Sequence, residues 1–333
     1  MDAFHYLRLF IERNDKFIIT AHETPDGDAL GAETALYQAL KKLGKGVEIC
    51  NADPTSKKYK FLDPDEHINI VRREDDISLP LEEYALIILD TSDIHNIGLV
   101  YDFIFPNIKE YFIVDHHESL ENRVTKNHVE ESASSTCEIL YDFFFEQGWE
   151  IDFTVAQALF VGIVYDTGSF IYPKTSAKTF SIAYSLVSIG VNPNYIYQRI
   201  YESNSISALM LQSRVLSTLE LFFNQHVALV TMTKETIAEC GALYEEADTI
   251  INIPLKSEPI RVSVFLKENE KGVLRCSMRS KGNIDVARIA QTFGGGGHKT
   301  AAGFKSKWPI ETLKQKVLEM LSTYTKEMEE FLE

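Results

Sequence analysis

The chain has 333 residues, of which 45% are hydrophobic and 25% are charged, and its formal net charge at pH 7 is −16. This length exceeds that of a typical domain, so we expect two domains, each with its own core. The negative charge disfavours a protein that grips long nucleic acid, such as a long duplex, through a broad phosphate-binding surface.

The start of the chain favours a cytoplasmic protein. MDAFHYLRLFIERND carries acidic residues where a signal peptide would be basic, and it suits a short amphipathic helix. No apolar run approaches the ~20 residues that span a bilayer, so no membrane association is expected. The cysteines have no C-x-x-C spacing and are predicted to be free thiols in a reducing cytosol: Cys50, Cys137, Cys240 and Cys276.

From residue 16 onward, apolar strand patterns alternate with helical patterns, which predicts a parallel α/β sheet. We expect a helix at 29–43 that ends at Gly44, and a polar connection at 51–84. The expected strands are 16–21, 47–50, 85–89 and 111–114.

Polar side chains follow the apolar runs at the points where they end. Because the carboxyl ends of parallel strands meet at one edge of a sheet, these side chains should lie close together. Imidazole and carboxylate ligands without thiolate suit Mn²⁺ or another borderline divalent ion, and two ions need more than four ligands. We therefore predict a two-metal hydrolytic centre. The residues are His22, Asp26 and Asp28 after the first strand, Asp90 after 85–89, Asp115, His116 and His117 after 111–114, and Asp166 at the end of an apolar segment at 153–164.

Several of these features also have simpler interpretations. Asp26 and Asp28 precede a helix and could act only as its caps. Ser134 to Thr136 precede another apolar helix; capping alone is favoured, and a phosphate held by the free amides and hydroxyls of this helix start is the alternative. The 153–164 segment is read as a helix, with a strand as the second choice. Gly168 would permit a tight turn that lets Asp166 fold back towards the metals.

The second half of the chain predicts a smaller α/β domain with a mixed sheet. The GVNPN break at 190–194 follows a helix at 177–189 and precedes a helical stretch that continues to 220. We expect a catalytic domain at 1–190, a helical linker at 191–210 and a substrate-binding domain at 211–333. Its expected elements are a hairpin turning at Asn224-Gln225, helices within 234–247, strands at 259–267 and 273–279, a helix at 284–293, an alternating segment at 300–304 and a last helix at 308–331.

Four consecutive glycines follow the helix at 284–293. They could be a flexible loop or a helix stop, but bare backbone amides also suit a phosphate nest, and the next residue adds a side-chain donor. These residues are Gly294, Gly295, Gly296, Gly297 and His298. Arg279 lies at the end of a predicted strand. An arginine in such a position is more often an exposed charge than a substrate-binding residue.

Five motifs in order resemble those of the DHH phosphoesterases. The H-x-x-x-D-x-D of residues 22–28, the isolated Asp90, the D-H-H of 115–117 and the D-T-G of 166–168 match the four motifs of the catalytic domain. GGGGHKTAAGF at 294–304 resembles the glycine-rich signature of the DHH-associated C-terminal domain. Length and spacing are most similar to the small NrnA-type members. The resemblance implies an oligoribonuclease that also dephosphorylates adenosine 3′,5′-bisphosphate.

The resemblance also implies a role for each matching residue. One metal would take His22, Asp26 and Asp90, and the other Asp28, Asp90, His116 and Asp166. Asp115 would orient an imidazole, and His117 would donate to the phosphoryl or leaving oxygen. Arg279, the glycine run and His298 would meet the phosphate of the substrate. The expected cofactors are two Mn²⁺, with Mg²⁺ or Co²⁺ as alternatives. The expected partners are short oligoribonucleotides and a nucleoside bisphosphate, with a second copy in a homodimer as a further candidate.

Three other functions fit part of the pattern. An exopolyphosphatase or inorganic pyrophosphatase shares the first four motifs, and the C-terminal glycine signature argues against both. A linear or cyclic dinucleotide phosphodiesterase is nearer, although the cyclic-dinucleotide enzymes often carry sensory membrane segments. A nucleotide-binding regulator without activity would have no need of a catalytic-type imidazole at His117.

Overall fold

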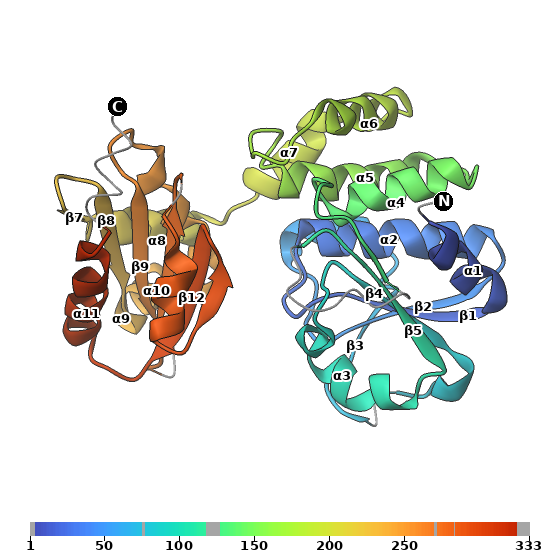
Figure 1. Cartoon of the computed structure of the whole chain (residues 1–333), viewed down its shortest axis with the longest axis horizontal. Coiled ribbons are helices and arrows are strands. Elements are labelled where there is room, and N and C mark those ends of the chain that lie inside the picture. Colours follow the sequence, from blue (N-terminus) through green and yellow to red (C-terminus); the bar gives the residue numbers. More distant parts are fainter. Residues whose placement is uncertain (1–3, 75–76, 118–126, 270–271, 283, 325–333) are drawn as a thin grey trace. The chain divides into compact units, whose positions relative to one another are not determined.

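A computed structural model describes residues 4–74, 77–117, 127–269, 272–282 and 284–324 of the chain. Its fold divides between Ser203 and Asn204 into two units, each with its own cores (Figure 1). The division falls inside the segment 191–210 that the sequence predicts as a linker. Within the described residues, no helix has both the length and the apolar character needed to cross a bilayer.

The N-terminal unit is built on a parallel sheet of six strands among the described residues, which confirms the predicted α/β class. The central strand β4 (Ala85–Leu89) is apolar and buried along its whole length because both faces of the sheet are covered. In spatial order the strands are β3 (Ile68–Ile70), β2 (Gly46–Asn51), β1 (Lys16–Thr20), β4 (Ala85–Leu89), β5 (Glu110–Asp115) and β6 (Asn127–Val129).

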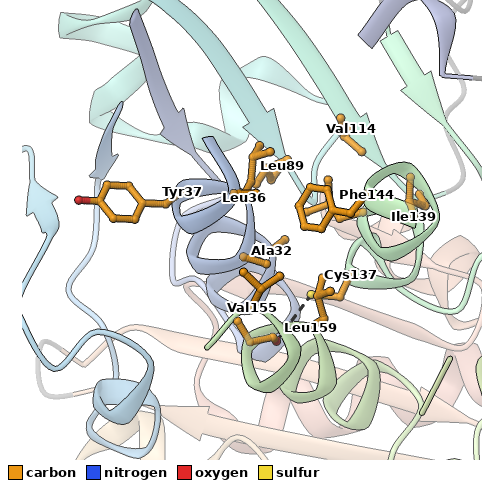
Figure 2. Packing of buried hydrophobic residues seen from close by; sticks show 14 of the residues in the cluster. Ala32, Leu36, Tyr37, Leu89, Val114, Cys137, Ile139, Phe144, Val155 and Leu159 are labelled. Atoms are coloured by element: carbon orange, nitrogen blue, oxygen red, sulfur yellow. Dashed lines mark hydrogen bonds between the residues drawn. The ribbon is translucent and has the colours of Figure 1, made fainter. Parts of the chain in front are cut away.

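Alternate side chains of the central strands enter two different cores. Ile87 and Leu89 of β4 pack with the helices of the larger core, whereas Leu86 and Ile88 face the smaller core beneath α3 (Leu99–Phe103). The larger core contains apolar residues of α1 (His5–Arg13), α2 (Gly27–Lys42), α4 (Thr136–Glu146), α5 (Phe153–Asp166), α6 (Ala177–Ser188) and α7 (Pro193–Tyr201). Figure 2 shows part of it, where side chains of α2, α4 and α5 meet those of β4 and β5.

Helices α2 and α5 approach each other closely through glycines. A Cβ on Gly31 would lie 2.5 Å from the carbonyl oxygen of Ala158, and a Cβ on Gly162 would lie 2.4 Å from Oδ1 of Asp28. Contacts this short leave no room for any side chain. The two glycines therefore allow α5 to pack directly against the turn of α2 that carries Asp28.

The C-terminal unit contains a mixed sheet of six strands in the described part of the chain, as predicted. β8 (Val227–Met232) and β9 (Val262–Glu268) are parallel, and the other neighbours are antiparallel. One face packs on α10 (Val286–Thr292) and α11 (Ile310–Ser322), and the other on α8 (Ile206–Leu216) and α9 (Lys234–Cys240). The strands in order are β11 (Gly296–His298), β12 (Ala301–Ser306), β10 (Leu274–Ser280), β9 (Val262–Glu268), β8 (Val227–Met232) and β7 (Glu220–Phe222).

The structure departs from the predicted elements in several places. Among its described residues, the polar connection 51–84 contains β3 and 3₁₀ helices that include η1 (Lys57–Leu62) and η3 (Leu81–Glu83). The helix expected to continue to residue 220 is broken into α7 and α8, because Ser205 caps a new helix by accepting a hydrogen bond from the amide of Ala208. Of the last predicted helix, residues 325–331 lie outside the described residues.

Candidate metal centre

The first candidate ligands lie between β1 and α2. His22 Nδ1 is 2.7 Å from the carbonyl oxygen of Glu23, and since a carbonyl only accepts, Nδ1 is the donor and Nε2 is the nitrogen left for a metal ion. Asp26 caps α2 by accepting two amide hydrogen bonds through Oδ1, and its Oδ2 lies 3.8 Å from His22 Nε2. Capping and metal binding would therefore use different oxygens of the same carboxylate.

Asp28 is fully buried and is held by the start of another helix. Its Oδ2 accepts a hydrogen bond from the amide of Thr136 at 2.6 Å, and its Oδ1 accepts one from the amide of Cys137 at 3.0 Å. Ser135 caps this helix, α4, by accepting from the amide of Glu138 at 3.0 Å. The predicted capping role is thus present, and two of the amides considered for a substrate phosphate bind a carboxylate of the protein instead.

Asp90 lies in the middle of the cluster. It follows β4 with φ of +61°, a left-handed backbone that non-glycine residues rarely adopt. Its Oδ2 is 3.6 Å from Nε2 of His22, and its Oδ1 is 3.5 Å from Nε2 of His116. The hydroxyl of Thr136 donates to Oδ1 at 2.9 Å and holds the carboxylate in place. Each oxygen of Asp90 therefore faces a different imidazole.

His116 and Asp166 complete the side opposite His22. Nε2 of His116 is 2.8 Å from Oδ2 of Asp166 and 3.9 Å from Oδ2 of Asp28. Asp166 is the last residue of α5, so it reaches the cluster directly from the helix. The tight turn expected at Gly168 is present, with φ of +55°, but it lies beyond the end of the helix, so Asp166 reaches the cluster without it.

Asp115 orients the neighbouring histidines through hydrogen bonds. Its Oδ1 accepts from the amide of His116 at 2.8 Å and lies 2.8 Å from Nδ1 of His117, and its Oδ2 accepts from the hydroxyl of Ser92 at 2.6 Å. Burial favours the neutral carboxyl, but the bonds from His117 and Ser92 outweigh it and lower the pKa of Asp115 to about 2. An ionised Asp115 keeps the His117 ring in a fixed orientation.

The buried carboxylates of the cluster need a compensating positive charge. Burial and then the neighbouring carboxylates raise the pKa of Asp90 well above its usual range, and burial and then Asp166 raise the pKa of Asp28. Among the described residues, no lysine or arginine forms an ion pair with these carboxylates. Divalent cations would supply the missing positive charge and restore ionised oxygens as ligands.

Three groups of side chains have ligand atoms close enough to share an ion. All the atoms of each group lie within 4.8 Å of one another. Both ring nitrogens of His116 are buried, and Nε2 faces the carboxylates of Asp28, Asp90 and Asp166, which suits an imidazole that binds metal through Nε2. The donor set of carboxylate and imidazole fits Mn²⁺ or Mg²⁺. The groups are His22, Asp26 and Asp90; Asp28, His116 and Asp166; and Asp90, His116 and His117.

The first two groups correspond to the two ligand sets expected from the sequence, with one difference. Asp90 is expected to bind both ions, but it belongs only to the first of these two groups. The third adds His117, which the sequence assigns to proton donation rather than to metal binding. Sequence reasoning missed Thr136 as the donor to Asp90, Ser92 as the partner of Asp115, and Gly162, which leaves the space that Asp28 occupies. In the sequence, the only indication of these two hydroxyls is that Thr136 precedes an apolar run and Ser92 follows one.

The predicted substrate-binding residues lie in the C-terminal unit. Arg279 is half-buried near the end of β10, opposite Ala301 of β12. The amides of Gly294 and Gly295 donate to the carbonyls of Gln291 and Ala290, so they end α10 and are not available to a phosphate nest. Gly296, Gly297 and His298 form the edge strand β11, and the side chain of His298 is not among those the structure describes.

Two family models match the sequence. The N-terminal domain of the DHH family matches residues 16–163, and the DHHA1 domain matches residues 227–329. The first range includes every candidate ligand except Asp166, and the second includes Arg279 and the glycine run.

Curated relatives match along most of the chain. A bifunctional oligoribonuclease and PAP phosphatase NrnA of Thermus thermophilus is 29% identical over 307 residues, which are 90% of this chain and 87% of the relative. The protein of the same name from Bacillus subtilis is 27% identical over 293 residues, 87% of this chain and 88% of the relative.

Solved structures share the fold. An exopolyphosphatase-related protein of Bacteroides fragilis superposes with a TM-score of 0.91 at 25% identity, covering 98% of this chain and 97% of that chain. The exonuclease RecJ bound to manganese has a TM-score of 0.52 at 13% identity, covering 98% of this chain and 94% of that chain, which indicates a shared fold.

Proposed function

We propose that the chain is a DHH-family, metal-dependent phosphoesterase that hydrolyses short oligoribonucleotides to mononucleotides and adenosine 3′,5′-bisphosphate to AMP, because the DHH N-terminal domain and the DHHA1 domain both match its sequence. The observation that carries the proposal is the position of Asp90, whose two oxygens face His22 and His116. A carboxylate so placed can hold two ions at once. The NrnA relatives, whose names state both activities, support the choice of substrates.

Two divalent ions, which we propose to be Mn²⁺ with Mg²⁺ or Co²⁺ as substitutes, would occupy this centre. His22, Asp26 and Asp90 would hold one, and Asp28, Asp90, His116 and Asp166 the other. When bound, the ions lower the pKa of a water molecule and offset the charge that develops on the phosphoryl group. Asp115 keeps the ring of His117 oriented, and His117 gives a proton to the leaving oxygen.

The C-terminal unit is proposed to bind a second phosphate of the substrate through Arg279, the backbone of the glycine run and His298. The amides of Gly294 and Gly295 already donate hydrogen bonds to carbonyls at the end of α10. We therefore assign these two glycines the role of positioning the strand β11 that follows. The net charge of −16 repels a long polyanion, so affinity must come from the metal ions and a few local groups. We therefore propose a preference for substrates of two to about five nucleotides.

We also propose that the enzyme is cytoplasmic and that two copies can associate. All four cysteines are unbonded, as predicted, which fits a reducing compartment. Helix α6 exposes Phe180, Tyr184 and Val187 at helical spacing, and these residues could be covered by a second copy. Light scattering on the purified protein distinguishes a dimer of about twice 37.9 kDa from a monomer.

A panel of substrates tests the function. The purified chain is assayed with Mn²⁺ against an adenylyl dinucleotide, adenosine 3′,5′-bisphosphate, pyrophosphate, polyphosphate and a cyclic adenosine dinucleotide. We expect the highest kcat/KM for the first two. The cyclic substrate is included because a cyclic-di-AMP phosphodiesterase GdpP of Geobacillus thermodenitrificans is 25% identical over 96% of this chain and 49% of the relative. Highest activity on pyrophosphate or polyphosphate would overturn the proposal.

A further inference from the structure

The segment between α5 and α6, residues 167–176, begins at one candidate ligand and touches another. It follows Asp166 directly, and near its other end the ammonium of Lys174 donates to the carbonyl oxygen of His116 at 3.0 Å. Since Asp166 and His116 are themselves in contact, this segment, which we call the α5–α6 loop, lies along the edge of the metal centre.

The α5–α6 loop has a fixed conformation. Gly168, Ser169 and Phe170 are three consecutive residues with φ of +55°, +62° and +69°, and two of them are not glycine. The amide of Phe170 donates to the Thr167 hydroxyl at 2.9 Å, and the amides of residues 171 and 172 donate to the Thr167 carbonyl. The Phe170 ring contacts those of Phe160 and Phe180. A left-handed backbone held this firmly is typical of functional segments.

This fixed loop presents an aromatic ring beside the centre. Tyr172 is 52% exposed, and a Cβ on Gly168 would lie 2.5 Å from Cζ of its ring, so the ring rests directly on the glycine backbone. Gly168 is two residues from Asp166, which places their Cα atoms within about 8 Å of each other. The ring therefore stays close to a candidate metal ligand while much of its surface remains open.

Lys174 adds a positive charge to the same edge. It forms no ion pair with an acidic side chain within the described residues, although the chain has 49 acidic residues. The ammonium has three donors, of which the carbonyl of His116 takes one. An aromatic ring and an ammonium without an acidic partner, carried by the same loop, are the groups that recognise the base and the phosphate of a nucleotide.

We propose that the α5–α6 loop is a nucleoside-binding subsite of the catalytic unit, in which a nucleobase stacks on Tyr172 and Lys174 contacts a phosphate oxygen. This inference rests on the proposed nucleotide substrates and assigns recognition of their bases to the catalytic unit. Stacking on an aromatic side chain tolerates all bases, so the subsite would favour nucleotides over inorganic phosphates without choosing among sequences.

The test compares substrates with and without bases. Hydrolysis by the full chain is measured for a 5′-phosphorylated adenylyl dinucleotide and for two analogues, each abasic at one position. Tyr172→Ala should lower kcat/KM for the dinucleotide roughly 5- to 150-fold, the range expected for one lost stack. For the analogue that lacks the stacked base, the same substitution should have little effect. Tyr172→Phe should restore the wild-type difference between the substrates.

Two further variants separate recognition from structure. Lys174→Gln should lower kcat/KM for all three substrates alike and leave the bound metal unchanged, with partial recovery in Lys174→Arg. Tyr6→Ala, which truncates an exposed tyrosine of α1, is the matched control and should behave as wild type. Equal losses on all three substrates in Tyr172→Ala, or no loss on any, would overturn the stacking role. Loss of metal in Lys174→Gln would show that Lys174 only secures the backbone of His116. Failure of the wild type to cleave any of the substrates would instead reject the proposed function.

Discussion

Gly162→Ala should damage the metal centre although the substitution adds only a methyl group. The new Cβ would lie 2.3 Å from Sγ of Cys137 and 2.4 Å from Oδ1 of Asp28, and Asp28 is itself fixed by two amides of α4. Overpacking of this kind costs about 1–3 kcal/mol, whereas alanine gains only about 1 kcal/mol over glycine in a helix. We therefore expect a net loss of about 0–2 kcal/mol in the free energy of unfolding, together with weaker metal binding.

The double variant Gly162→Ala, Cys137→Ala separates the two contacts. It removes the sulfur but leaves the clash with Asp28, so stability should recover in part while metal affinity stays low. Denaturant unfolding reports the stability, and isothermal titration with Mn²⁺ reports the affinity. If Gly162→Ala is more stable than wild type and binds Mn²⁺ normally, or if the double variant regains full affinity, the close contact between α5 and Asp28 is not what shapes the site.

Three other substitutions test separate parts of the account. His117→Ala should keep its metals and lose turnover by roughly 10²-fold or more, as expected for a lost proton donor; loss of metal would make His117 a ligand. Arg279→Ala should raise KM for a dinucleotide far more than it changes metal content, and wild-type enzyme should prefer the dinucleotide to a twenty-mer at fixed salt. Burial raises the pKa of Glu33 to about 8, so the folded chain binds an extra proton and its stability should fall as pH rises from about 4.5 to 8. Glu33→Gln should flatten that fall in denaturant titrations at pH 5 and pH 8, and an unchanged slope would contradict the burial argument.

Strands β1, β2, β4 and β5 and most candidate ligands of the N-terminal unit could be predicted because their signals are local. An unbroken apolar run such as 85–89 indicates a strand buried on both faces, and a polar residue directly after it, such as Asp90, must lie at the edge of the sheet. The helix start at Thr136 could also be predicted, because Ser134 to Thr136 directly precede an apolar helical run.

The contacts that tune the site depend on tertiary packing, which no local pattern shows. The amides at the start of α4 donate hydrogen bonds to Asp28, which lies more than a hundred residues earlier in the chain. Likewise, the four glycines look like one phosphate nest in the sequence, but Gly294 and Gly295 end a helix while Gly296 and Gly297 pair with β12. The short strand β3 has only three residues, too few to show alternation.

Metal content and turnover of Asp90→Asn test the central claim most directly. The account places Asp90 between two ions, so the purified variant should lose both metals and all measurable hydrolysis of the dinucleotide, whereas His22→Ala should lose mainly one metal. Asp90→Asn that retains two metals per chain and near-normal turnover would contradict the account.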